Sequence, residues 1–356
     1  MEALHSDIQM KILLHLPPKP LGRCVCVSKK WASMIREKQF RDLYLLRSMT
    51  RPRMMFTIKI SETDAYVHSV HQAEEPFLSS DKRRMHVPLE YTSMSQSIRG
   101  LICLRNGFKF ALWNPSINKH LTLPEIQHPR ELATITSFLG YDEATDVHKV
   151  LYMAIYVYDR PSRAKEFQVL TVGGSWRRVR CKHRHYPLTD GLCKGGVLYY
   201  GATSGRGKKS LVMSFNVSSE KFSVIDLPEE VKLGNICYVW KLVNYNGEVA
   251  LVHDNYVNGV VRMWVRNGVS GEWRRDFVEI PRWREIVGDV YFSFRGTVGS
   301  GELVFTAHVH RDSSDFILYY NRVTQNLRRF IAVGQDVGHL PHVETFLDHV
   351  DSVFLI

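Results

Sequence analysis

The stretch from Gly201 to Ser210 combines residue types that bind phosphate. It reads GATSGRGKKS, with several glycines, two lysines and a terminal hydroxyl group. A phosphate-binding loop has a glycine, four residues and then Gly-Lys-Ser/Thr at the start of a helix. Here five residues separate Gly201 from Gly207, Lys209 occupies the Ser/Thr position, and strand-like sequence flanks the stretch. We therefore interpret it as the tip of a β-hairpin.

A group of possible zinc ligands precedes this hairpin, with Cys181, His183 and His185 at alternate positions and Cys193 further on. Structural zinc sites usually space their ligands as C-x₂₋₄-C and H-x₃₋₅-H. Alternate residues share a strand face only locally, so this spacing does not favour a metal site. The H-E-x-x-H and G-x-S-x-G motifs do not occur. We assign no catalytic, cofactor-binding or metal-binding residue and expect a protein that is not an enzyme.

A basic run extends from Arg177 to Arg184, with Arg or Lys at nearly every second position. In a strand this period places several cationic groups on one face. Such a face could bind RNA or DNA. A solvated outer strand, or a docking surface for an acidic protein, is the interpretation that we favour.

The elements that carry these residues are predicted to be β-hairpins. From Phe56 onward, short runs rich in Val, Ile, Tyr, Phe and Trp alternate with Gly, Asn, Asp and Ser. One hairpin type recurs at residues 111–124, 212–228, 262–281 and 318–333. Measured at Phe215, Trp264 and Tyr320, its last three copies are 49 and 56 residues apart, which suits kelch-like blades of four strands. We predict a propeller-like ring of about six blades, with a β-sandwich of long hairpins as the competing architecture.

The first fifty residues carry a helical period instead. Ser6 and Gln9 fit a capping box at the start of one helix. Leu16-Pro17-Pro18 ends that helix, because a residue before proline is disfavoured in the α region. Two further short helices follow, the second capped by Ser28, and an apolar face continues to about Leu46. The region is too small to bury an independent core.

Charge is distributed unevenly along the 356 residues. The formal net charge is +11, and residues 1–53 contain 11 Lys/Arg against four Asp/Glu. An acidic protein or a phosphate backbone could use this field. No apolar run approaches the roughly 18 residues of a membrane span, and the N-terminus lacks a cleavable signal. We expect reduced cysteines, no membrane partner, and a nuclear and/or cytoplasmic location.

The N-terminal region resembles an F-box, whose pattern is roughly Leu-Pro, Asp-Leu, Glu-Ile-Leu, Leu-Pro, Lys-Ser-Leu, Arg, Val-Ser-Lys and Trp. The corresponding residues here are Leu4-His5, Asp7-Ile8, Lys11-Ile12-Leu13, Leu16-Pro17, Lys19-Pro20-Leu21, Arg23, Val27-Ser28-Lys29 and Trp31. His5, Lys11 and Pro20 depart from the pattern, which has Pro, Glu and Ser at these positions. The apolar residues of the F-box pattern are retained.

The remainder resembles the type 3 F-box-associated domain of plant F-box proteins. The junction Arg51-Pro52-Arg53-Met54-Met55-Phe56 is similar to theirs, and further similar segments follow in the family's order. These are Ile98–Cys103, Trp113–Ser116, Phe138–Asp142, His185–Pro187, Asp190–Cys193, Gly196–Tyr200 and Thr345–Val350. Together the two resemblances cover nearly the whole chain.

The resemblance implies a mainly β protein with a small N-terminal α domain: a three-helix F-box at residues 1–47 and a kelch-like, propeller-type domain at 48–356. It implies a substrate-recognition subunit of a cullin–RING (SCF-type) ubiquitin ligase, which binds a Skp-type adaptor and an unknown target protein. The expected adaptor-binding residues are Leu4, Ile8, Ile12, Leu16, Pro17, Leu21, Val27 and Trp31; some of them must instead pack inside the F-box. A basic nucleic-acid-binding module and a kelch-like small-molecule binder are the alternatives.

Overall fold

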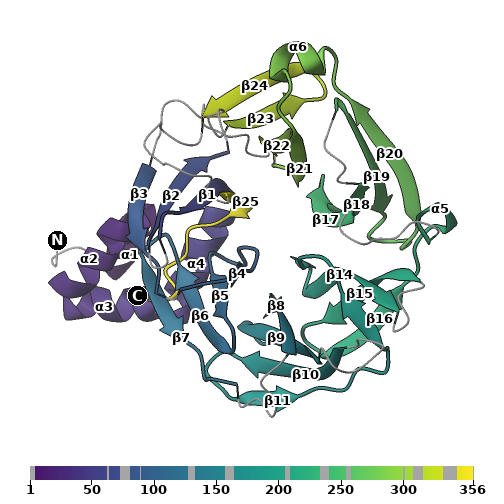
Figure 1. Ribbon diagram of the computed structural model, residues 1–356. Helices are drawn as coiled ribbons and strands as arrows, with labels where there is room; N and C mark the ends of the chain where they lie inside the picture. Colours follow the sequence, from purple (N-terminus) through teal and green to yellow (C-terminus); the bar gives the residue numbers. More distant parts are fainter. Residues whose placement is uncertain are drawn as a thin grey trace.

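The N-terminal region forms four consecutive helices beside a ring of β-sheets (Figure 1). The computed structural model describes residues 5–61, 64–72, 81–88, 90–126, 133–156, 164–204, 209–232, 240–253, 258–299, 301–307, 316–331 and 343–355. The helices are α1 (Ser6–His15), α2 (Pro18–Val27), α3 (Lys29–Arg36) and α4 (Lys38–Met49). The three expected helical segments are α1 to α3, and the apolar run that continues to Leu46 forms α4. This last helix crosses the predicted domain boundary between residues 47 and 48, which stays a prediction.

The expected capping box at the start of α1 does not form, and that prediction is wrong. His5 occupies the N-cap position without a side-chain hydrogen bond to the helix. Gln9 is instead buried, and its Oε1 accepts a hydrogen bond of 3.0 Å from Trp31 Nε1. The glutamine therefore links α1 to α3 across the bundle and does not cap α1.

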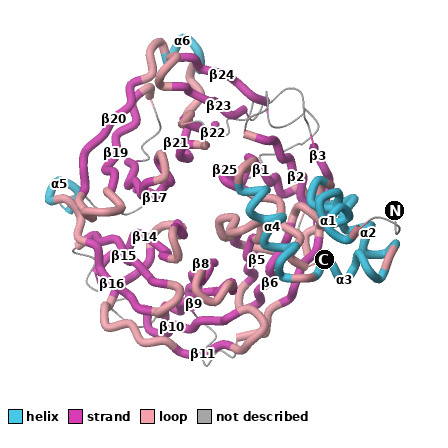
Figure 2. Tube along the Cα trace, turned by 180° about the vertical axis from the view of Figure 1, so that it is seen from behind, coloured by secondary structure: helices cyan, strands magenta, loops and turns pink. Residues whose placement is uncertain are grey.

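The β region is a six-bladed propeller, as predicted, and not a sandwich (Figures 1 and 2). Blade 1 pairs β25 (Val343–His349), β1 (Arg53–Lys59), β2 (Asp64–His71) and β3 (Asp81–His86). Blade 2 contains β4 (Ser93–Met94), β5 (Ile102–Asn106), β6 (Lys109–Asn114) and β7 (Lys119–Thr122). Blade 3 contains β8 (Ala133–Asp142), β9 (Val147–Tyr156), β10 (Ala164–Thr171) and β11 (Trp176–Arg178).

The other three blades follow in chain order around the ring. Blade 4 contains β12 (His185–Pro187), β13 (Leu192–Lys194), β14 (Val197–Ser204), β15 (Ser210–Asn216) and β16 (Lys221–Ile225). Blade 5 contains β17 (Trp240–Tyr245), β18 (Glu248–His253), β19 (Val260–Arg266) and β20 (Trp273–Glu279). Blade 6 contains β21 (Phe292–Thr297), β22 (Leu303–Ala307), β23 (Phe316–Asn321) and β24 (Asn326–Ile331). Two short helices, α5 (Glu229–Lys232) and α6 (Trp283–Val287), lie at the outer rim (Figure 1).

The recurring hairpin of the sequence is the turn between the third and fourth strands of a blade. Asn114, Asn216, Asn267 and Asn321 each end or follow the third strand, and each side-chain oxygen accepts a backbone N–H two or three residues on. Four residues after each asparagine, the backbone has a positive φ, at Asn118, Glu220, Gly271 and Gln325. An Asx turn followed by a left-handed residue reverses the chain between paired strands. This local chemistry explains why the repeat was recognisable.

Burial between blades explains the long apolar runs. Side chains alternate across a strand, so in β1 Met54, Phe56 and Ile58 pack toward blade 6 while Met55 packs toward blade 2. Each neighbouring pair of blades shares one such buried cluster. β25 closes the ring by pairing antiparallel with β1, which joins the two ends of the domain in one sheet. Closure removes the open edges that a sandwich would leave.

Candidate functional site

The N-terminal helices enclose a small apolar core of their own. Leu13, Leu21, Ile35 and Phe40 are almost completely buried in it, and Val353 from the segment after β25 completes it. Tyr44 Oη donates to the backbone oxygen of Leu16, and Arg47 Nη1 donates to that of Leu14. The turn between α1 and α2 is thereby fixed to α4.

The eight predicted adaptor-binding residues divide into four groups. Leu21 and Trp31 are buried and support the bundle from within; Leu16 is half-buried, and Leu4 lies outside the described residues. The remaining four side chains are exposed: Ile8, Ile12, Pro17 and Val27. Their role in adaptor binding stays a prediction, but these four are the members of the set that are accessible to a partner.

Helix α4 presents a second exposed apolar stripe that the predicted set did not include. Leu43, Leu46 and Met49 are 39%, 59% and 48% exposed, whereas Phe40 and Tyr44 on the same helix are buried. The spacing carried the signal: at about 100° per residue, Phe40 and Tyr44 fall on one side of the helix, Leu46 and Met49 fall on the opposite side, and Leu43 lies between the two. Exposed apolar side chains on a surface that is otherwise basic indicate an interaction site.

The segment after β25 fastens the helices to the propeller. Asn114 in blade 2 is fully buried, and its Nδ2 donates to the backbone oxygens of Ser352 and Phe354 at 2.9 Å each. On the other side of the segment, the Asp351 N–H donates to Ser48 Oγ of α4 at 2.6 Å. The Arg41 guanidinium lies 5.8 Å from the Phe354 ring centroid. The helices and blade 2 therefore share one docked segment.

Charged pairs reinforce this joint. Arg53 at the start of β1 pairs with Asp351 at 3.5 Å, and Asp351 also accepts a hydrogen bond from Ser116 Oγ. Lys38 of α4 pairs with Asp146 in the β8–β9 turn. Figure 2 shows the helices grouped at one side of the ring, beside blades 1 and 2. The orientation of the helices on the ring is thus fixed at several points.

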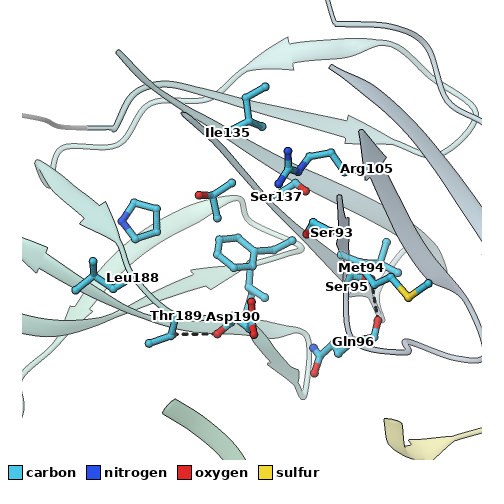
Figure 3. A pocket seen from close by; sticks show the side chains of 16 residues that line it. Ser93, Met94, Ser95, Gln96, Arg105, Ile135, Ser137, Leu188, Thr189 and Asp190 are labelled. Carbon is cyan, nitrogen blue, oxygen red and sulfur yellow. Dashed lines mark hydrogen bonds between the residues drawn. The ribbon is translucent and has the colours of Figure 1, made fainter. Parts of the chain in front are cut away.

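A second candidate site is a cavity of about 210 Å³ in the inner part of the ring (Figure 3). Blade 2 contributes residues 93–96 and Arg105, blade 3 contributes 135–139 from β8, and blade 4 contributes 187–191 and Leu198. Three blades therefore meet at this cavity. Most of its exposed lining is polar, and the polar residues include Ser93, Ser137, Thr189, Arg105 and Asp190. A concave pocket with a few convergent polar groups, here assembled from three consecutive blades, is the usual form of a binding site.

The residues first considered for chemistry do not form a catalytic or metal centre in the described part of the chain. There, no group of three His, Cys, Asp or Glu side chains could hold a metal ion. His185 is buried, with Nδ1 bonded to the backbone oxygen of His183 and Nε2 to Tyr200 Oη. The Cys181 thiol also donates to the oxygen of His183, and burial raises the pKa of Cys193 to about 11. His183 and His185 therefore interact within blade 4 and the segment before it, while Cys193 packs between blade 4 and blade 3.

A hairpin flanks the glycine-rich stretch, whereas only the start of the basic run lies in a strand: β11 ends at Arg178, and residues 179–184 are not in a strand. β14 and β15 flank the first and pair antiparallel, as predicted, while residues 205–208 lie outside the described part. β11, the outermost strand of blade 3, carries Arg177 and Arg178, which pair with Glu220 and Glu166. Because carboxylates already neutralise part of this strand, it does not favour a nucleic-acid surface. Among the described helices, none is long and apolar enough to cross a membrane.

A helical bundle joined to a six-bladed ring defines the class: an F-box with an associated β-propeller. The F-box domain model matches residues 1–43, and the model of the F-box associated beta propeller domain matches residues 53–350. The chain therefore belongs to the F-box proteins with a type 3 F-box-associated domain, as the sequence resemblance indicated.

Its relatives include several proteins of Arabidopsis thaliana. "Putative F-box protein At1g70970" is 45% identical over 402 residues, which cover 100% of this chain and 98% of that protein. "Putative F-box protein At1g70960" is 43% identical, with the same coverage. "F-box/kelch-repeat protein At3g04660" is 34% identical and covers 98% of this chain and 92% of that protein. The similarity thus extends through both the helices and the propeller.

Proposed function

We propose that this chain is the substrate-recognition subunit of a cullin–RING (SCF-type) ubiquitin ligase, working in the nucleus and/or cytoplasm. The observation that carries the proposal is an F-box with exposed apolar side chains, which the segment after β25 fastens to a propeller with a polar pocket. The F-box docks on a Skp-type adaptor, and the propeller holds a target protein. The chain makes or breaks no covalent bond; it raises the effective concentration of target lysines near the ubiquitin donor.

The proposed adaptor surface combines exposed apolar groups with positive charge. Ile8 and Ile12 on α1 and Val27 at the end of α2 supply the apolar part. Lys19, Arg23 and Lys29 on and beside α2 are also exposed. A positive surface accelerates association with an acidic partner and makes the rate depend on salt. We therefore expect an adaptor whose contact face is acidic around an apolar groove.

The test is co-purification of the full chain with a Skp-type adaptor and a cullin. Val27 is 73% exposed and its side chain supports no buried contact, so Val27→Glu leaves the fold intact while placing a charge in the apolar patch. Ile8→Glu makes the same change on α1. We expect the double variant to lose adaptor binding by tenfold or more, because a carboxylate buried at an interface without a partner is strongly unfavourable.

The matched control is Val323→Glu, in the β23–β24 turn of blade 6. Val323 is 93% exposed, so the substitution makes the same change in charge and volume far from the F-box in sequence. Its adaptor binding should equal that of the unaltered chain. Equal binding by the Ile8/Val27 variant would refute the adaptor surface, and failure of the unaltered chain to bind any Skp-type adaptor would refute the ligase assignment.

A further inference from the structure

Arg105 is a half-buried cation without a protein partner. It is the penultimate residue of β5 and lines the inner cavity, where Figure 3 shows its side chain extending toward Ser137. Its Nε is buried and unbonded, and no residue in the described ranges forms an ion pair or a hydrogen bond with its guanidinium. Burial lowers its pKa, since no nearby carboxylate offsets the lost hydration.

Two other half-buried arginines of this propeller are paired, whereas Arg266 Nε in blade 5 is buried and unbonded like Arg105 Nε but does not line this cavity. Arg328 in blade 6 makes a two-pronged pair with Glu302, at 2.7 and 2.8 Å. Arg53 in blade 1 bonds to Ser69, His71 and Asp351. A cation withdrawn from water normally acquires such partners because its desolvation is costly. Arg105 carries that cost unrelieved at the wall of a cavity.

A second unpaired donor lines the same cavity. Gln96 Nε2 is buried and has no hydrogen-bond partner among the described residues, although the Gln96 backbone oxygen accepts a bond from Ser95 Oγ. The cavity thus contains a guanidinium and an amide N–H₂ group, both of which lack acceptors. The guanidinium requires an oxygen-rich, negatively charged group, whereas any acceptor of a bound segment satisfies the amide.

The size of the cavity indicates what carries that group. Its volume of about 210 Å³ is smaller than the roughly 300–1,000 Å³ of sites for drug-sized ligands. The space is large enough for one side chain of a bound segment, which is the occupant that the proposed function requires. Asp190 is the one carboxylate among the residues that line the cavity. It lies in blade 4, whereas Arg105 lies in blade 2, and because Asp190 is exposed, water screens its negative charge.

We propose that this cavity binds an anionic side chain of the target protein, a carboxylate or a phosphoryl group, through the Arg105 guanidinium; Gln96 lies on the opposite side of the cavity (Figure 3). The inference rests on the proposed function, because it specifies which feature of a target the propeller recognises. A guanidinium matches two oxygens of either group in a planar, two-pronged pair. The target segment then lies across the inner ends of blades 2, 3 and 4.

The experiment measures how the immobilised full chain retains four degenerate peptide libraries. Each library has one fixed central residue, either phosphoserine, Glu, Ser or Gln, between randomised positions. We expect retention of the phosphoserine library, the Glu library or both to exceed that of the neutral libraries by about tenfold, which corresponds to one charge-assisted pair. The ratio of the phosphoserine to the Glu library distinguishes the two sources of charge.

Two variants separate the pocket from general electrostatics. Arg105→Gln should abolish the preference for anionic libraries. Arg178→Gln removes the same charge from the outer strand β11 and should keep that preference, so an equal loss in both variants would overturn the proposal. Retention of no library, or Arg105-dependent binding of inorganic phosphate without any peptide preference, would overturn it as well.

Stability and adaptor binding provide the remaining readouts. Because Arg105 makes no compensating contact, Arg105→Gln should unfold at a temperature equal to or above that of the unaltered chain. A marked decrease would assign Arg105 a structural role and refute the proposal. Co-purification of Arg105→Gln with the Skp-type adaptor should be unchanged. Adaptor binding without any anionic preference would thus refute the pocket while leaving the ligase assignment intact.

Discussion

Asn114 allows the joint between F-box and propeller to be tested quantitatively. Its Oδ1 accepts the Ser116 N–H in the Asx turn, and its Nδ2 donates to two carbonyl oxygens of the docked segment, at Ser352 and Phe354. Asn216 occupies the same turn position in blade 4, but it is exposed and bonds only within its own turn, to Ser219. The two asparagines therefore differ by the two hydrogen bonds to the segment.

Asn114→Ala removes the turn bond and leaves both carbonyl oxygens without a donor. At about 1–3 kcal/mol for the buried Ser352 oxygen and about 1 kcal/mol for the part-buried Phe354 oxygen, we expect it to cost about 2–4 kcal/mol more than Asn216→Ala. For a chain of this length that difference lowers the midpoint of thermal unfolding by about 3–5 °C. Asn114→Asp keeps the acceptor for Ser116 but places a carboxylate against two carbonyl oxygens, so it should destabilise at least as much.

The assay is calorimetric unfolding of the three variants, with amide hydrogen exchange at Asp351. The Asp351 N–H is bonded to Ser48 Oγ of α4, so its exchange reports directly on detachment of the segment. Faster exchange in both Asn114 variants, and unchanged exchange in Asn216→Ala, is the expected result. If Asn114→Ala and Asn216→Ala unfold at the same temperature, the segment after β25 does not fasten the N-terminal helices to the propeller.

Two further predictions concern the same region. Gly100 (φ +79°) is so close to the segment after β25 that a Cβ there would lie 2.5 Å from the Val350 oxygen, whereas a Cβ at Gly107 (φ +56°) would meet open space. Gly107→Ala therefore introduces only the backbone strain of about 1 kcal/mol. Gly100→Ala should lower the midpoint of thermal unfolding well below that of Gly107→Ala. Burial lowers the pKa of His349 to about 4, so between pH 6.5 and 4 the unfolded chain binds a proton that the folded chain does not. The free energy of unfolding should therefore decrease by about 3 kcal/mol from this group as the pH falls through that window. His349→Gln should flatten this dependence, measured as unfolding midpoints at a series of pH values.

Those parts of the fold that depend on local chemistry were predictable. The asparagine that starts the outer hairpin in blades 2, 4, 5 and 6 and the left-handed residue four positions on are both encoded within five residues. Ring closure is not local in this sense. β25 has no hairpin partner beside it in sequence, and it pairs with β1 almost 300 residues away, with Met55 opposite Phe346. Nothing in either strand alone specifies the other.

The F-box surface was only partly predictable because a polar residue faces inward. Ile8, Ile12 and Leu13 suggest one apolar face of α1, but the buried residues are Gln9 and Leu13, and the two isoleucines are exposed. Gln9 turns inward because its oxygen accepts the Trp31 N–H, and burial of an indole requires such an acceptor. Periodicity counts apolar residues and cannot anticipate that pair.

Arg105 illustrates the limit of sequence analysis at the pocket. It precedes Asn106-Gly107, a turn signal, so the sequence predicts an ordinary strand end. That its guanidinium has no partner depends on what β8 and residues 187–191 bring to face it, from blades 3 and 4. Only the ring determines which strands face each other there.

Blade 2 contributes to both of the proposed binding functions, and this constrains how the protein works. β5 supplies Arg105 to the pocket, while its hairpin partner β6 ends at Asn114, which holds the segment bonded to α4. α4 ends at Met49 and β1 begins at Arg53, so the direct connection is also short. A target held in the pocket would therefore lie at a fixed distance from the adaptor surface. Rigid spacing raises the effective concentration of only those lysines that this distance can reach. Loosening the joint by Asn114→Ala should consequently broaden the choice of modified lysines without weakening adaptor binding.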